Sequence, residues 1–116
     1  MSTLLPKDFA LLSCSKDSLQ AQCTLSPSLP WFKGHFPHCP ILPGVAELYL
    51  LDAAVKLGWG EQCHLAGFSQ LKFLCPLSPG ARVRLEVSAL KASRWRFALY
   101  SGATEQLCAK GEFTLC

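Results

Sequence analysis

Residues 31–45 combine a titratable imidazole with rigid neighbours and a glycine. His35 precedes Phe36, and three prolines then follow before Gly44 opens a helical pattern. Proline fixes φ and glycine permits close backbone approach, so this segment is predicted to be a shaped loop. An imidazole titrates near neutral pH, and a helix N-terminus presents free N–H groups. The segment, called the His35 loop below, therefore suits catalysis by proton transfer.

The elements that must position the His35 loop are one helix and several strands. Residues 44–57 are rich in Ala and Leu and contain no proline, which predicts a helix that ends at Gly58-Trp59-Gly60. Its side chains are apolar on most sides, which predicts burial in a core. Alternation of apolar and polar residues or a bounded apolar run predicts strands at 18–25, 65–74, 82–88, 94–99 and 107–115.

Short turns such as Pro79-Gly80 and Ser101-Gly102 separate the later strands. Short turns favour antiparallel neighbours, so the pattern predicts an α+β architecture in which an antiparallel sheet wraps one long helix. A chain of 116 residues fits one domain, spanning 1–116. A domain this small buries a modest share of its surface, so self-association is expected.

Composition excludes several classes of protein. Hydrophobic residues make up 50% of the chain and charged residues 16%, with a formal net charge of +3. The basic residues form no run, which argues against nucleic-acid binding. No apolar stretch reaches the ~18 residues of a membrane span. Residues 9–14 loosely resemble a lipoprotein cleavage site, but Asp8 and the short apolar run argue against export, so a cytoplasmic protein is expected.

Neither a metal nor a cofactor is expected. The seven cysteines include no CxxC pair and fall mostly in apolar segments, which favours reduced thiols. His35, His38, Cys39 and His64 could be imagined as ligands, but their spacing matches no standard zinc pattern.

The motif Gly34-His35-Phe36-Pro37, followed by residues 40–45 with the letters PILPGV, resembles the signature of hot-dog-fold 3-hydroxyacyl-[acyl-carrier-protein] dehydratases. Weaker similarity extends over residues 18–116, and the chain looks most like the small dehydratases of aryl-polyene biosynthesis. The resemblance implies a hot-dog fold, a dimer with a substrate tunnel at its interface, and an acyl carrier protein as partner.

The resemblance also implies roles for individual residues. His35 is the expected base, and its ordinary pKa of ~6.5 lies near working pH. The N–H groups of Gly44 and Val45 are expected to bind the thioester oxygen, because the first amides of a helix lack intrahelical acceptors. Phe36 and Pro43 are expected to contact substrate.

One position departs from the family pattern. Fourteen residues after the histidine, where the family has Asp or Glu from the partner chain, this sequence has Tyr49. At ~100° per residue, Glu47 points about 200° away from Tyr49, whereas Asp52 points about 60° away. Both acids are expected to be helix-surface or interface charges. Tyr49 is either the acid that protonates the departing hydroxyl or a core aromatic.

Three functions stay open on the sequence. The first is dehydration of 3-hydroxyacyl thioesters on acyl carrier protein, with Tyr49 as the acid or with His35 performing both proton transfers. The second is a weakly active or non-catalytic subunit that completes a heterodimeric dehydratase. The third is an acyl thioesterase, against which the Gly-His-Phe-Pro motif argues. Alternating arginines (Arg82, Arg84, Arg94 and Arg96) are either a solvated sheet face or a docking surface for an acidic carrier protein.

Overall fold

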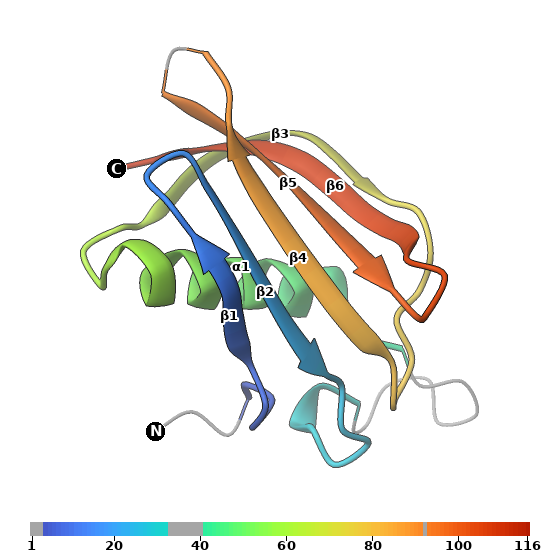
Figure 1. Cartoon of the computed structure of the whole chain (residues 1–116). Coiled ribbons are helices and arrows are strands. Elements are labelled where there is room, and N and C mark those ends of the chain that lie inside the picture. Colours follow the sequence, from blue (N-terminus) through green and yellow to red (C-terminus); the bar gives the residue numbers. More distant parts are fainter. Residues whose placement is uncertain (1–3, 33–40, 92) are drawn as a thin grey trace.

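The computed structural model describes residues 4–32, 41–91 and 93–116. It contains six strands, a short 3-10 helix and one long helix (Figure 1). In chain order these are β1 (Ala10–Cys14), β2 (Ser18–Thr24), η1 (Pro30–Phe32), α1 (Gly44–Trp59), β3 (Leu65–Phe73), β4 (Arg82–Ala89), β5 (Arg94–Ser101) and β6 (Gln106–Leu115).

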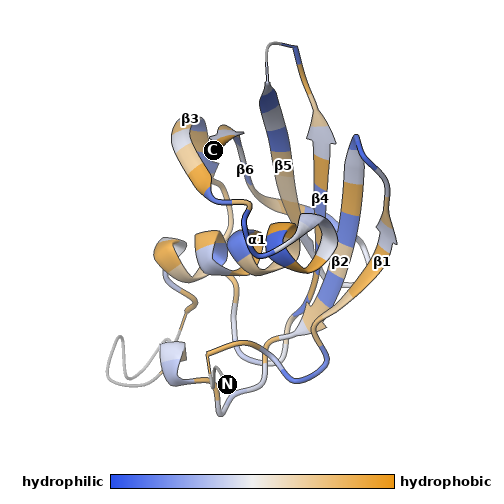
Figure 2. Ribbon diagram, turned by 90° about the vertical axis from the view of Figure 1, so that its left-hand side faces the viewer, coloured by the Kyte–Doolittle hydropathy of each residue, from blue (hydrophilic) through white to orange (hydrophobic). Residues whose placement is uncertain are grey.

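The strands form one antiparallel sheet in the order β1-β2-β4-β5-β6-β3. Consecutive strands β4, β5 and β6 pair through short turns, while β3 joins at the far edge beside β6. Figure 1 looks through the sheet onto α1, and the side view of Figure 2 shows the strands curving around the helix. The expected α+β hot-dog architecture is therefore confirmed.

The core lies between α1 and the concave face of the sheet. Alternate residues of the strands point inward, as the burial of Val83, Leu85 and Val87 on β4 shows. They meet one buried stripe of α1, made of Ala46, Glu47, Leu50, Leu51, Ala54 and Val55. The opposite side of α1 stays open, because Val45 is 64% exposed and Leu57 is 55% exposed. The helix is buried on one side and not, as its composition suggested, on all sides.

The expected helix and strands are found with small shifts at their ends, and β1 is an element that the sequence did not predict. β1 pairs only with β2 and has four exposed residues among its five, so it lacks the alternation that marks a half-buried strand. Within the described ranges, no helix is long and apolar enough to cross a membrane.

β3 packs unusually closely against the rest of the sheet. An ideal Cβ placed on Gly111 of β6 would lie 2.6 Å from Cδ2 of Leu71 and 2.9 Å from Cε1 of Phe97. Real Cβ atoms do not approach other carbons so closely, so only glycine permits the observed position of Leu71. The missing side chain at 111 thus sets how tightly the edge strand β3 covers the core.

We expect Gly111→Ala to lower the free energy of unfolding by about 1–3 kcal/mol, the usual cost of forcing an extra carbon into a packed core. Urea denaturation of purified protein measures the change. Lys110→Ala is the matched control, since Lys110 is exposed on the other face of the same strand and should change stability by less than about 0.5 kcal/mol. Equal stability of Gly111→Ala and the control would contradict the close packing of Leu71.

Candidate active site

The first turn of α1 presents free backbone amides. Pro43 is the N-cap residue, and its carbonyl oxygen accepts hydrogen bonds from the N–H groups of Ala46 at 2.9 Å and Glu47 at 3.3 Å. No side chain of the described residues caps the N-terminus of the helix. The N–H groups of Gly44 and Val45 donate to no acceptor among the described residues. Two adjacent donors at the positive end of a helix can therefore stabilise an oxyanion.

The space beside the Gly44 Cα is filled by an aromatic ring from β3. An ideal Cβ on Gly44 would lie 3.1 Å from Cζ of Phe73 and 3.3 Å from its Cε1. Phe73 remains 49% exposed, so its ring shields one side of the helix start while its outer part stays open. Because Gly44 has no side chain, the Phe73 ring can lie against it. A thioester would therefore reach the Gly44 and Val45 amides from a side that the ring does not cover.

The ends of the His35 loop are tied to the core. On the N-terminal side, Phe32 is buried and Trp31 stacks at 5.9 Å between ring centroids on Tyr49 of α1. On the C-terminal side, the N–H of buried Leu42 donates to the carbonyl oxygen of Leu77 at 2.7 Å. His35 and Phe36 themselves lie outside the described residues. In the sequence, His35 follows Phe32 by three residues.

Tyr49 and Asp52 lie on the side of α1 that does not face the sheet. Tyr49 is half-buried against Trp31. Asp52 accepts a hydrogen bond at 2.6 Å from Nζ of Lys56, one turn further along the helix. Asp52 is thus the helix-surface charge that was expected, and its carboxylate is engaged by an ion pair.

Glu47 corrects an expectation, because it is not a surface charge. It is 3% exposed and heads the stripe of α1 that packs on the sheet. Its Oε1 has no hydrogen-bond partner among the described residues. Burial raises the pKa of the Glu47 carboxyl from 4.5 to about 8, so the group is mostly protonated at neutral pH. Burial also raises the pKa of the Cys108 thiol on β6, and the Glu47 charge contributes to that shift.

The position of Glu47 separates it from Tyr49. It lies on the stripe of α1 that packs on the sheet, whereas Tyr49 packs on Trp31 at the start of the His35 loop. The structure therefore brings Tyr49, Gly44 and Val45 to the open start of α1, and it places Glu47 in the core behind them. Sequence reasoning missed both Glu47 and Phe73, since a charge usually predicts exposure and Phe73 is one aromatic residue within an apolar strand.

This fold, an antiparallel sheet curved around one long helix, is the hot-dog architecture. Residues 12–112 match the family model described as ApeI-like, ApeI dehydratase. The 3-hydroxyacyl-[acyl-carrier-protein] dehydratase FabZ of Haemophilus influenzae is 33% identical over 88% of this chain and 79% of its own length. The chain belongs to the ApeI-like dehydratase family.

Solved structures agree with this assignment. The dehydratase heterocomplex ApeI:P from Xenorhabdus doucetiae contains a chain that superposes with a TM-score of 0.83 at 26% identity, covering 97% of this chain and 98% of that one. Mouse thioesterase superfamily member 2 superposes with a TM-score of 0.71 at 15% identity, covering 92% of this chain and 80% of that one. The second likeness reflects the shared fold alone.

We expect Glu47→Gln to change how stability depends on pH. Because the folded state holds the Glu47 proton up to about pH 8 while the unfolded chain releases it near 4.5, the wild type loses stability relative to the variant as pH rises through this window. The slope is at most about 1.4 kcal/mol per pH unit. Urea denaturation at several pH values measures it.

Glu61→Gln is the control, because Glu61 is exposed just beyond α1. The free energy of unfolding of Glu61→Gln should change with pH in the same way as that of the wild type. If the Glu47→Gln curve were also parallel, the Glu47 carboxyl would not be held in its neutral form by burial.

Proposed function

We propose that this chain dehydrates 3-hydroxyacyl thioesters on acyl carrier protein to trans-2-enoyl thioesters, in fatty-acid-like or aryl-polyene biosynthesis. The observation that carries the proposal is the pair of Gly44 and Val45 amides, which donate to no acceptor among the described residues and follow the dehydratase motif around His35 in the sequence. Membership of the ApeI-like dehydratase family supports the same reaction class.

The reaction needs a base, an oxyanion site and an acid. His35 removes the α-proton of the thioester, since an imidazole exchanges protons readily near neutral pH. The enolate charge that develops on the thioester oxygen is stabilised by the Gly44 and Val45 N–H groups and by the positive end of α1. The bond from the β-carbon to the hydroxyl then breaks, and a proton joins the departing oxygen to form water.

The proton donor for the departing hydroxyl is Tyr49 or His35. Tyr49 lies on the open side of α1, one turn beyond Val45, and its hydroxyl can donate a hydrogen bond. A phenol is a weaker acid than the carboxylic acid of the family pattern. His35 can instead return the proton it has taken. Asp52 is engaged by Lys56 and Glu47 faces the core, so neither replaces the family acid.

Pro43 and Phe36 are the further substrate contacts of the proposal, and Phe36 lies outside the described residues. Pro43 fixes the start of α1 and carries no N–H of its own, so the first donors toward substrate are those of Gly44 and Val45. The exposed side chain of Val45 and the open edge of Phe73 give an apolar surface for the acyl chain next to the amides.

A second candidate function is that of a subunit in a heterodimeric dehydratase, whose partner supplies the missing acid. It is favoured by the superposition on a chain of the ApeI:P heterocomplex and by Tyr49 in place of a carboxylate. β3 is an edge strand with exposed Phe68 and Phe73, followed by exposed Leu74, and such an edge is suited to pairing with another hot-dog subunit. A thioesterase has no comparable support.

The decisive experiment follows the mass of a 3-hydroxyacyl carrier-protein thioester incubated with purified protein. If the substrate loses one water when this chain is the only enzyme present, the result supports the dehydratase. Turnover only after a second hot-dog dehydratase subunit is added supports the heterodimer. Release of a free acid supports a thioesterase and contradicts both proposals.

His35→Ala should lower the rate of dehydration by about 10²–10⁴-fold, because it removes the base. The same mass assay measures it, in whichever assembly turns over substrate. His64→Ala is the matched control, since His64 is an exposed histidine before β3. Wild-type turnover by the His35→Ala variant would remove this residue from the mechanism.

Tyr49→Phe separates the two proton donors. If Tyr49 is the acid, the variant should lose about 10²-fold in kcat, since the phenyl ring keeps the packing on Trp31 and loses only the hydroxyl. Tyr100→Phe, on the outer face of β5, controls for loss of a phenol elsewhere. An unchanged kcat for Tyr49→Phe would leave both proton transfers to His35.

A further inference from the structure

Two cysteines meet where the chain leaves β3. Cys75 lies two residues after the end of β3, and Cys108 lies on the neighbouring strand β6. The carbonyl oxygen of Cys108 accepts hydrogen bonds from the N–H groups of Leu74 at 2.7 Å and Cys75 at 3.2 Å. With standard bond lengths, the second bond places the cysteine Cα atoms no more than about 7 Å apart, and disulfides join Cα atoms at ~4.4–6.8 Å. The backbone therefore allows the two thiols to be joined with little movement.

Both thiols contact the same residue of β6. Nε2 of Gln106 donates to Sγ of Cys75 at 3.0 Å, and Sγ of Cys108 donates to the carbonyl oxygen of Gln106 at 3.4 Å. Burial raises the pKa of the Cys108 thiol, and the direct interaction of this thiol with that of Cys75 adds to the shift. The two sulfur atoms thus lie together beside Gln106, as a disulfide between them requires.

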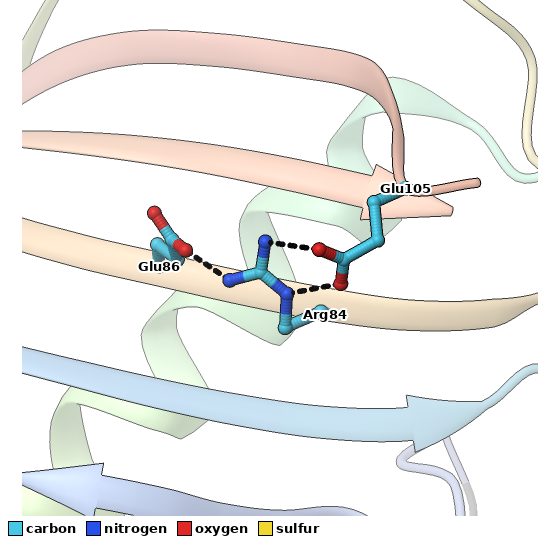
Figure 3. A network of polar contacts seen from close by, with 3 residues as sticks. All are labelled: Arg84, Glu86 and Glu105. Carbon is cyan, nitrogen blue, oxygen red and sulfur yellow. Dashed lines mark hydrogen bonds and ion pairs between the residues drawn. The ribbon is translucent and has the colours of Figure 1, made fainter. Parts of the chain in front are cut away.

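A polar network holds Gln106 in place. Glu105 precedes it in the β5–β6 turn and accepts hydrogen bonds from Arg84 of β4, at 2.5 Å from Nε and 3.0 Å from Nη2 (Figure 3). Arg84 also pairs with Glu86 on its own strand. Gln106 itself lies opposite Ser101 in the β5–β6 register. The residue that both thiols contact is therefore anchored by the two neighbouring strands.

The two thiols differ in their access to solvent. Cys75 is partly exposed, whereas Cys108 is only 1% exposed. A buried thiol with a raised pKa reacts slowly with reagents from solution. A small oxidant therefore reaches Cys75 first, and Cys108 is placed to react with Cys75.

We propose that Cys75 and Cys108 form a redox-sensitive dithiol, which a low-molecular-weight disulfide oxidises to a bridge between β6 and the end of β3. The Cys75 thiolate attacks one sulfur of the oxidant, whose disulfide bond breaks and releases a thiol that takes up the Cys75 proton. Cys108 then loses its proton and attacks Sγ of Cys75, which releases the other half of the oxidant as a second thiol. Two protein thiols are oxidised, and the oxidant is reduced to two thiols. This chemistry is independent of the proposed dehydration.

The bridge acts on one wall of the candidate active site. Phe73, whose ring lies against Gly44, is two residues before Cys75. In the reduced protein, the backbone hydrogen bonds of Leu74 and Cys75 to Cys108 hold this end of β3 in place. Such bonds break in local opening, whereas a covalent bridge does not. Oxidation therefore restrains the strand end that carries Phe73.

The test incubates reduced, purified protein with oxidised glutathione under native conditions. After the remaining thiols are blocked, peptide mapping by mass spectrometry should find a cross-link between Cys75 and Cys108 that has lost two hydrogen atoms. Dithiothreitol should reverse it. Amide hydrogen exchange at Leu74 and Cys75 should slow about tenfold in the oxidised form, because the bridge suppresses local opening.

Three variants separate the roles of the cysteines. Cys75→Ser should abolish both the cross-link and the slowed exchange. In Cys108→Ala the glutathione should stay on Cys75 as a mixed disulfide, because the second thiol is missing. Cys14→Ser is the matched control and should leave the bridge intact, since Cys14 is exposed and its Sγ donates to the carbonyl oxygen of Gly58 at 3.4 Å.

Three results would overturn the proposal. They are a stable glutathione adduct on Cys75 in the wild type, a bridge from Cys75 to any cysteine other than Cys108, and a bridge that forms only in urea. Unchanged amide exchange in the bridged protein would equally contradict the restraint on the end of β3.

Discussion

The contact between the Phe73 ring and Gly44 joins the edge strand to the start of the helix, and the site depends on it. It requires β3 to lie close over the core, which the missing side chain of Gly111 permits by admitting Leu71. A Cβ on the first residue of α1 would lie 3.1 Å from the ring, so a larger residue there would displace the ring by a few tenths of an ångström. The two free amides therefore stand at a fixed place relative to β3. Two glycines far apart in the sequence thus define one wall of the candidate site.

The secondary structure was predictable where its signals are local. Period-two alternation marked β2, β4, β5 and β6, and the Pro-Gly pair before α1 marked its first residue correctly. β1 carried no such signal, because an edge strand with a register shift and four exposed residues has no alternating face. The side of α1 that meets the sheet was also hidden, since its residues are apolar all round. This is why Glu47 was taken for a surface charge.

The two acidic residues of α1 lie in different environments. One acid is placed in the core in its neutral form, and the other, Asp52, is engaged by Lys56. Neither carboxylate is available at the open start of α1, so among the described residues of the helix Tyr49 is the remaining side chain there with a hydroxyl or carboxyl group. His35 was predicted from its motif and stays a prediction, because it lies outside the described residues, whereas the loss of alternative acids could be read only from packing. Sequence spacing gives the direction of a side chain around a helix but not what it meets.

β3 contributes both to the candidate active site and to the edge of the sheet. Its inner face carries Phe73 over Gly44, and its outer edge pairs with no other described strand. In the family arrangement each site combines the histidine of one chain with the acid of the other. A homodimer of this chain would then place Tyr49 in both sites. A heterodimer would complete one site with His35 and a partner carboxylate, and leave Tyr49 in the second. In that arrangement the number of sites with a carboxylate depends on the partner's acid.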